Sequence, residues 1–450
     1  DLVSAAIADG AEASAAVRQA GEQCAAMFSA MDDEYMRERA ADVRDVAARI
    51  CRILSGEAEH TITAPCLIAA EELTPSQTVQ FPRELVLGML TARGAANSHT
   101  GILARTLGVP AVSQLPVSRE LHGHTAILDG FSGTLTLDPD EKTLAEANAK
   151  IAAQQAQREA LRQLISAPSV TRDGRSIRLY ANIAGTDDLP LLQRSGAEGV
   201  GLLRSEFLYL GRSTYPTEDE LFESYRTIVQ AMDGREIIIR TLDIGADKQA
   251  GYFDMPPEDN PALGLRAIRL CLTRPILFQT QLCAILRASR YGNVGIMFPM
   301  VTGPDELHRL KEALADAEDV LIARGERFGP YRVGVMIETP AAVFMSGELA
   351  GEVDFFSIGT NDLTQYLLAM DRQNPNLAPF CDPHHPAVLR AIRQTVERAH
   401  QAGCTVGICG ELAADESLTE AFLRLGVDEL SVAPSRILPL RQKIRDLTLG

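Results

Sequence analysis

Eight short apolar runs alternate with longer amphipathic segments in the C-terminal part of the chain. The segment between each pair of runs is long enough for a helix or a longer connection. Strands buried on both faces of a parallel sheet give continuous apolar runs of this kind. Eight such units over roughly 275 residues favour a closed (β/α)8 TIM barrel over an open doubly wound sheet, and we predict that barrel for 173–450. The runs are IRLYANI at 177–183, GVGLLR at 199–204, EIIIRTL at 236–242, VGIMFPM at 294–300, RVGVMIE at 332–338, VDFFSIG at 353–359, TVGIC at 405–409 and ELSV at 429–432.

The first part of the chain has a different pattern. Residues 1–55 are rich in Ala and contain no Pro, and apolar side chains recur at helical spacing, which predicts two or three helices. Residues 56–140 change to short β-branched runs broken by Gly and Pro, as in a small α/β domain. Residues 141–165 lack both Gly and Pro and carry many charges and amides, so 141–172 is predicted to be a linker built on a helix.

Composition limits the classes of function. The chain is 46% apolar and 23% charged and has no apolar stretch of membrane-spanning length, which argues against membrane insertion. A formal charge of −17, from 43 basic and 60 acidic residues, disfavours binding to nucleic acid. The eight cysteines form no CxxC pair, so neither structural zinc nor a disulfide framework is expected. The N-terminal residues do not resemble a secretory signal, and we expect a cytoplasmic protein.

Polar residues that follow the apolar runs are candidates for chemistry, because barrel active sites lie at the C-terminal ends of the strands. Glu338 and Asp362 offer the hard oxygen ligands that suit Mg²⁺, and the arginines suit phosphate or carboxylate groups of an anionic substrate. A thiol at Cys409 could serve as a general acid toward carbon. A structural ion pair between Glu338 and Arg240 is the alternative. The candidates at this end are Arg204, Arg240, Glu338, Asn361, Asp362, Arg372 and Cys409.

A second candidate lies outside the barrel, in GAANSHTGILARTLGVPAV at 94–112. Asn97 or Ser98 can cap a helix that ends before Gly108 and Pro110, which places His99 at a helix N-terminus. The dipole there disfavours an imidazolium and stabilises an anion, so a neutral imidazole could attack phosphorus. The alternative is a histidine at an ordinary helical turn, and the other seven histidines have no supporting group of residues.

These motifs resemble those of a known family. The segment 94–112 resembles the phosphohistidine signature of the phosphoenolpyruvate-utilising enzymes, and SIGTNDLTQYLLAMDR at 357–372 resembles their barrel signature. Further strings are similar to those of Enzyme I of the bacterial sugar phosphotransferase system, in the same order along essentially the whole chain. They are DDEYMRERAADVRD, GAEGVGLLRSEFLYL, IIIRTLDIGADK, NPALGLRAIR, RASRYGNVGIMFPMV, VMIETPAA and ICGELAADE.

The resemblance implies a function and assigns roles. His99 would be phosphorylated by phosphoenolpyruvate with release of pyruvate, and would pass the phosphoryl group to a histidine of the carrier protein HPr, as its domain swivels between barrel and carrier. Arg204 and Arg240 would hold the phosphoryl group, with Lys248 and Arg266 as further members of the anion site. Glu338 and Asp362 would bind Mg²⁺, Asn361 and Arg372 would contact the substrate, and Cys409 would protonate the enolate carbon. A homodimer through the barrel is also implied.

Alternatives within the resemblance are a regulatory sensor that keeps the scaffold, and an enzyme like pyruvate phosphate dikinase or phosphoenolpyruvate synthase. Asn97 and Gly101 depart from the Thr and the Ala or Ser that the family usually carries at these positions. The chain begins at Asp1, and the resemblance implies further helical sequence before it and a longer tail after Gly450. The carrier-docking helices would then be only partly present, and the whole protein would be a separate Enzyme I or a fusion with carrier domains.

Overall fold

The protein is represented by a computed structural model that describes residues 2–29, 34–55, 62–73, 81–93, 100–101, 104, 108–210, 212–245, 251–372 and 374–450. The chain divides into two compact units, Asp1–Ala156 and Gln157–Gly450. None of the helices in these described ranges combines the length and the apolar character that a membrane span requires.

The first unit begins with helices, as the spacing of its apolar residues predicts. They are α1 (Leu2–Ala8), α2 (Ala13–Ser29) and α3 (Glu34–Ser55). Small residues allow α2 and α3 to approach closely, since a Cβ placed on Gly21 would lie 2.5 Å from the Cβ of Ala47. The buried face of α2 is formed largely by alanines such as Ala16 and Ala20.

A small α/β region follows these helices. Strands β1 (Cys66–Ala70), β2 (Val86–Thr91) and β3 (Ala111–Ser113) form a parallel sheet with β2 in the middle. Strands β4 (Ala126–Asp129) and β5 (Thr134–Leu137) form an antiparallel hairpin. Helix α6 (Glu141–Arg162) comes next and has no buried residue along its length.

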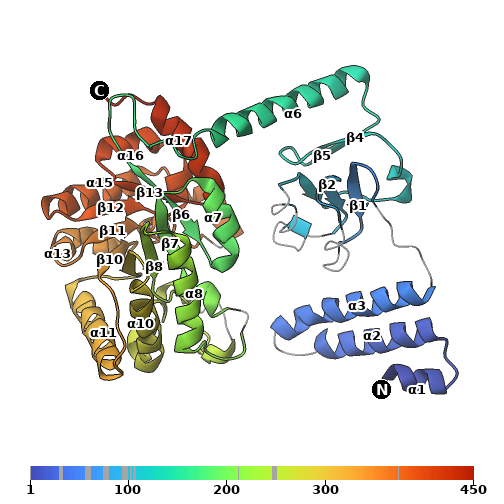
Figure 1. The fold of residues 1–450 in the computed structure, drawn as a ribbon, viewed down its shortest axis with the longest axis horizontal. Helices are drawn as coiled ribbons and strands as arrows, with labels where there is room; N and C mark the ends of the chain where they lie inside the picture. Colours follow the sequence, from blue (N-terminus) through green and yellow to red (C-terminus); the bar gives the residue numbers. More distant parts are fainter. Residues whose placement is uncertain are drawn as a thin grey trace. The chain divides into compact units, whose positions relative to one another are not determined.

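The second unit is a closed parallel barrel of eight strands, as predicted from the eight apolar runs. Figure 1 shows these strands at the centre of a ring of helices. The first and last strands pair directly, with Leu430 opposite Leu179, so the sheet has no free edge. The strands are β6 (Arg178–Ile183), β7 (Gly199–Arg204), β8 (Ile237–Arg240), β9 (Val294–Phe298), β10 (Tyr331–Ile337), β11 (Phe355–Ile358), β12 (Thr405–Ile408) and β13 (Glu429–Val432).

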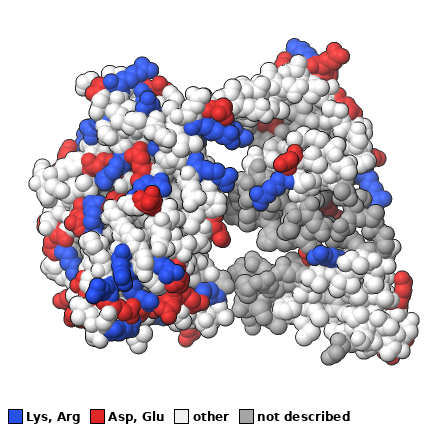
Figure 2. Space-filling model, viewed as in Figure 1, with Lys and Arg blue, Asp and Glu red and all other residues white. Residues whose placement is uncertain are grey.

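Amphipathic helices cover the outside of the strands. Helix α8 (Glu218–Ala231) begins with a capping box, in which the side chains of Thr217 and Glu220 each accept a hydrogen bond from the other's backbone N–H. Acidic and basic side chains are interspersed over the visible face of the barrel (Figure 2). The ion pairs of this unit include that of Arg287 with Glu218, at 2.7 Å. The helices of this unit are α7 (Leu189–Ser195), α8 (Glu218–Ala231), α9 (Ile268–Thr273), α10 (Pro275–Ser289), α11 (Pro304–Ala323), α12 (Pro340–Phe344), α13 (Ser346–Ala350), α14 (Thr360–Leu367), α15 (Pro386–Gln401), α16 (Thr419–Leu425) and α17 (Ile437–Asp446).

Candidate active site

Two arginines lie side by side at the C-terminal ends of neighbouring strands. Arg204 ends β7 and Arg240 ends β8, and the two residues are partners in the register of the parallel pair. Arg204 is half-buried, and among the described residues no hydrogen bond or ion pair of its guanidinium is found. Two neighbouring guanidiniums offer planar forks of donors that suit a phosphate or carboxylate group.

Arg240 is buried and is held by two carboxylates. Its Nη2 donates to Oε1 of Glu206 over 2.6 Å, and its Nη1 lies 2.9 Å from Oδ2 of Asp243. Burial alone would lower the pKa of Arg240, but these carboxylates raise it, so the guanidinium stays charged. Its Nε is buried without a hydrogen-bond partner among the described residues. Among the described residues the carboxylates paired with Arg240 are thus Glu206 and Asp243, whereas Glu338 acts on it only through its charge, which also raises the pKa of Arg240.

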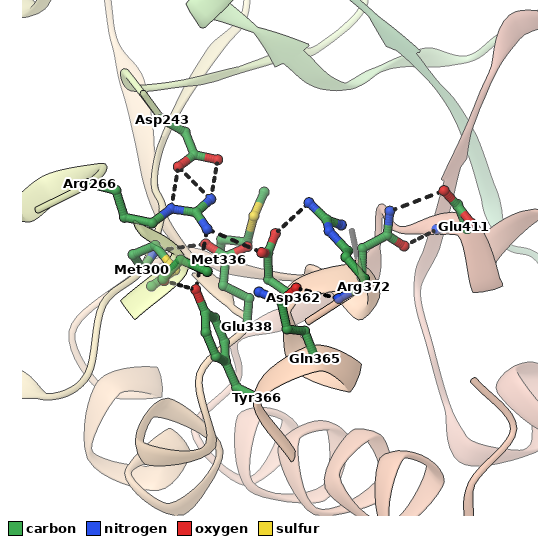
Figure 3. Close-up of polar contacts among 12 residues, drawn as sticks. Asp243, Arg266, Met300, Met336, Glu338, Asp362, Gln365, Tyr366, Arg372 and Glu411 are labelled. Carbon is green, nitrogen blue, oxygen red and sulfur yellow. Dashed lines mark hydrogen bonds and ion pairs between the residues drawn. The ribbon is translucent and has the colours of Figure 1, made fainter. Parts of the chain in front are cut away.

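Arg266 extends this network toward the next carboxylate. Its Nη2 lies 2.9 Å from Oδ1 of Asp243 and its Nη1 lies 3.4 Å from Oδ1 of Asp362. Figure 3 shows the resulting row of polar contacts, from Asp243 through Arg266 and Asp362 to Arg372. Only about 2% of Arg266 is exposed. A guanidinium so deeply buried is held in place by its carboxylate partners.

Glu338 lies at the end of β10 and is almost fully buried, with 1% exposed. Its Oε1 accepts a hydrogen bond of 2.7 Å from the backbone N–H of Met300, whose φ of 58° is unusual for a residue other than Gly. Gly359 is required beside it, because a Cβ there would lie 2.7 Å from Oε2 of Glu338. Burial raises the pKa of Glu338 to about 8, and the nearby Asp362 carboxylate adds to this effect.

Asp362 and Asn361 lie in the first turn of α14, directly after β11. Oδ2 of Asp362 is 3.7 Å from Nη2 of Arg372, whose backbone N–H donates to Oε1 of Gln365. Oδ1 of Asn361 accepts a hydrogen bond of 2.9 Å from the backbone N–H of Glu411. The polar residues predicted after β11 and β12 are therefore brought to the same end of the barrel.

Cys409 follows β12 and is buried, with 3% exposed. Its apolar neighbours include Met336 and Phe355, and its Sγ lies 3.7 Å from the backbone oxygen of Ile358. Burial raises the pKa of the Cys409 thiol to about 11. The sulfur therefore carries a proton at neutral pH, as a general acid must.

The carboxylates fit a divalent cation. Glu338 and Asp362 are both buried, and two acids that destabilise each other's charge would be stabilised by a hard cation between them. No group of three or more His, Cys, Asp and Glu side chains suited to a metal occurs in the described part of the chain. A pair of carboxylates leaves other positions to water and substrate oxygens, which is the usual way in which Mg²⁺ is held at phosphate sites.

Two of the predicted residues, His99 and Lys248, lie outside the described residues. Next to His99, the described residues Thr100, Gly101 and Ala104 are helical, and Thr100 and Ala104 are buried. The strand-end argument missed Glu206 and Asp243, although each lies two or three residues after a strand-end arginine, Glu206 after Arg204 and Asp243 after Arg240. A carboxylate so soon after a strand-end arginine is the signal that could have identified them.

Three family models match the chain. One described as "PEP-utilising enzyme, PEP-binding domain" covers residues 158–449, one described as "PEP-utilising enzyme, mobile domain" covers 62–133, and one described as "PEP-utilising enzyme, N-terminal" covers 1–39. The first covers more than half of the chain and contains every described residue of the candidate site.

Curated relatives match nearly the whole chain. A phosphoenolpyruvate-protein phosphotransferase of Bacillus subtilis (strain 168) is 43% identical over 446 residues, which are 98% of this chain and 78% of that protein. One of Geobacillus stearothermophilus is 45% identical over 430 residues, 94% of this chain and 74% of that protein. One of Staphylococcus carnosus (strain TM300) is 42% identical over 441 residues, 97% of this chain and 77% of that protein.

Proposed function

We propose, since this chain belongs to the phosphoenolpyruvate-protein phosphotransferase family of phosphoenolpyruvate-utilising enzymes, that it moves a phosphoryl group from phosphoenolpyruvate to His99 and then to a carrier protein. The P–O bond to the enol oxygen breaks and a P–N bond to the imidazole forms. The enolate left behind takes a proton at its terminal carbon and becomes pyruvate. The phosphoryl group then passes to a histidine of the carrier HPr, and His99 returns to its starting state.

The observation that carries the proposal is that Arg204 and Arg240 lie opposite each other at the ends of two adjacent strands. Arg266 is linked to Arg240 through the carboxylate of Asp243, which pairs with both. Phosphoryl transfer depends on positioning and on stabilising charge that spreads over the phosphoryl oxygens. A guanidinium without a described partner, Arg204, is free to bind the phosphoryl group, while carboxylates hold Arg240 in position. Asn361 and Arg372 at the rim would contact the rest of the substrate, and Lys248 would add a further positive charge.

The metal of this site is proposed to be Mg²⁺, held by Glu338 and Asp362. When bound, it would supply positive charge beside the phosphate and the enolate oxygen. The hydrogen bond from the Met300 N–H fixes the carboxylate of Glu338 for this purpose. The Arg372 and Arg266 guanidiniums flank Asp362 and hold its carboxylate in place.

Cys409 is proposed as the acid that delivers a proton to carbon. The apolar side chains around its sulfur exclude water, and the raised pKa keeps the thiol protonated until an enolate forms nearby. The resulting thiolate would lie within the field of Arg204 and Arg240, which both favour the negative sulfur. Solvent would return the proton after pyruvate leaves.

His99 would travel to this site with the region that matches the mobile-domain model. A histidine at a helix N-terminus is suited to hold a phosphoryl group, because the helix dipole stabilises its negative charge. We extend the proposal to a homodimer formed through the barrel and to a cytoplasmic location, both expected from the family resemblance.

The test is intact mass after incubation with phosphoenolpyruvate and Mg²⁺. We expect one added phosphate that is labile in acid, together with one equivalent of pyruvate. The adduct should be missing from a His99→Ala variant and from wild type kept free of divalent metal. Addition of an HPr protein should remove the phosphate from His99 and place it on the carrier.

Each contrary result excludes a different part of the proposal. No adduct on the folded wild type would contradict the phosphohistidine step and favour a sensor. An adduct that forms from ATP and phosphate in place of phosphoenolpyruvate would point to a dikinase-like enzyme. An adduct that HPr cannot accept would confine the activity of this chain to the first half of the reaction.

A further inference from the structure

A buried arginine at the side of the barrel holds the end of the linker. Arg441 lies in α17 with only 1% of its surface exposed. Each nitrogen of its guanidinium donates a hydrogen bond, at distances from 2.7 to 3.1 Å. The acceptors are Ser169 Oγ, Leu164 O, Ile165 O, Gly196 O and Glu198 Oε1.

The acceptors at 164 and 165 are the backbone carbonyls that follow helix α6. They lie in the turn just after the last helical residue, Arg162, where side chains of Arg or Lys can bond to backbone carbonyls that no longer have a helical partner. Here Nη1 of Arg441 bonds to both Leu164 and Ile165, each at 3.0 Å. A residue 276 positions away in the sequence therefore fixes the point where the linker joins the barrel.

Helix α6 itself has no comparable attachment. None of its residues from Glu141 to Arg162 is buried. A helix without a buried face gains no stability from tertiary packing and keeps its direction only through its ends. The Arg441 contacts hold the backbone directly after this helix, at Leu164 and Ile165.

Gly196 makes this attachment possible. Its φ is 71°, and a Cβ at this position would lie 2.6 Å from the backbone oxygen of Ile165 and 2.9 Å from Nη1 of Arg441. The buried guanidinium of Arg441 and the positive φ of Gly196 thus both allow the same contact, that of Arg441 with the backbone at 164–165. Either can be changed without touching the candidate active site.

We propose that Arg441 is a positioning residue for phosphoryl transfer to His99, because it fixes the exit of linker α6 from the barrel. This inference rests on the proposed function. When two reacting groups are tethered, their effective concentration depends on the stiffness and direction of the tether. A loosened exit spreads the linker over more directions, so His99 meets bound phosphoenolpyruvate less often, while the binding of phosphoenolpyruvate to the barrel stays unchanged.

Three variants test the proposal on the full chain. Arg441→Lys keeps the charge but loses the planar fork of donors. Gly196→Ala places a Cβ against the backbone oxygen of Ile165 and Nη1 of Arg441, so both must shift away from position 196. Ser169→Ala removes one acceptor and is the mildest change, which keeps the test informative if a stronger variant fails to fold. Gly325→Ala is the matched control for Gly196, since its φ is 72° with nothing within 4 Å of the added Cβ. Lys443→Gln is the control on α17.

Two measurements are made on each variant. Amide hydrogen exchange at Leu164, Ile165 and Ala167 reports whether the linker exit has loosened, since these amides donate to backbone oxygens of the held turn, as in the 2.9 Å bond from Leu164 N to Leu161 O. Single-turnover phosphorylation of His99 is followed over a range of phosphoenolpyruvate concentrations. We expect faster exchange and a maximal rate lower by on the order of tenfold, at an unchanged half-saturating concentration. Both controls should match wild type.

Each other outcome overturns the inference. Faster exchange with an unchanged rate would leave Arg441 a purely structural residue. Unchanged exchange in all three variants would show that these contacts do not hold the linker exit. A higher half-saturating concentration at an unchanged maximal rate would place the effect in the barrel site. Wild type that is not phosphorylated at all would instead contradict the proposed function, which separates the two failures.

Discussion

The carboxylate of Asp243 accepts hydrogen bonds from both Nε and Nη2 of Arg266, the shorter being 2.9 Å. The same carboxylate lies 2.9 Å from Nη1 of Arg240. A single buried acid thus sets the distance between two guanidiniums that start on different segments. Removing one partner of a buried ion pair costs about 3–5 kcal/mol of stability, because it leaves an uncompensated charge.

Asp243→Asn should therefore weaken the binding of phosphoenolpyruvate and lower stability together. We expect the half-saturating phosphoenolpyruvate concentration to rise by about tenfold or more, since two guanidiniums lose their common partner. Titration of phosphoenolpyruvate in the single-turnover assay measures this change, and thermal unfolding measures the stability. Asp319→Asn, on the exposed face of α11, is the control. Unchanged half-saturation in a destabilised variant would limit Asp243 to a structural role.

The sequence predicts the strands better than the contacts between their side chains. Strands such as Val294–Phe298 are buried throughout, so they give continuous apolar runs that can be recognised without a structure. Arg240 was found because it ends such a run. The role of Asp243 depends on Arg266, which comes from a segment 23 residues later, and no local pattern encodes that contact.

Unusual backbone conformations could not be predicted from the sequence either. Met300 and Ala267 have φ values of 58° and 54°, in a region that residues other than Gly rarely adopt, and both lie next to the candidate site. Their conformation is imposed by the packing around them, since neither Met nor Ala favours it. The attachment of Arg441 to the linker was missed for a similar reason, as its acceptors are mostly backbone carbonyls that any sequence would supply.

Gly359→Ala should displace Glu338 and weaken the binding of a divalent metal. The added Cβ would lie 2.7 Å from Oε2 of Glu338 and 3.1 Å from Sδ of Met336, so the carboxylate must move. We expect the dissociation constant of Mn²⁺, used as a spectroscopic probe for Mg²⁺, to rise by about tenfold or more. Gly303→Ala, with nothing within 4 Å of the new Cβ, is the control. Equal Mn²⁺ affinity in both variants would argue against Glu338 as a ligand.

Cys409→Ala should slow the formation of pyruvate by about 10²-fold without changing the half-saturating phosphoenolpyruvate concentration, because it removes the proposed acid. Cys404→Ala is a matched control, since Cys404 is also buried and lies at the other end of strand β12. Transfer of solvent deuterium into the methyl group of pyruvate reports the proton step directly. Equal rates in the two variants would assign the proton to another group.

The pH dependence of the proton step follows from the burial of the thiol. Because the pKa of Cys409 is raised to about 11, the acid form persists as the pH rises through the range where an ordinary thiol ionises. The rate of carbon protonation should thus show no loss from this group between pH 7 and pH 10, where a thiol with the usual pKa of about 8.5 would lose most of its proton. A decline centred near pH 8.5 that Cys409→Ala abolishes would contradict this prediction.

At the opposite end of the barrel, Glu429 is buried at the start of β13 with 4% exposed. A Cβ on Gly201 would overlap its carboxylate, which shows how closely the strands pack around it. Burial raises the pKa of Glu429 to about 8. The charged and titratable groups that face it are Arg178 and Arg332, which oppose the rise, and Glu236 and Asp428, which add to it.

Glu429 should make the stability of the protein fall as the pH rises. Its pKa is about 8 in the folded state and near the ordinary 4.5 when unfolded, so between these values the folded protein holds a proton that the unfolded chain has lost. Raising the pH through this window removes that proton at a cost of up to about 1.4 kcal/mol per pH unit. Glu429→Gln stays neutral and escapes this loss. The difference in melting temperature between Glu429→Gln and wild type should therefore shift in favour of the variant as the pH rises from 5.5 to 8.5. For the control Glu397→Gln, which is exposed on α15, this difference should not change with pH. If the plots of melting temperature against pH were parallel for Glu429→Gln and wild type, Glu429 would already be ionised at low pH and paired with Arg178 or Arg332.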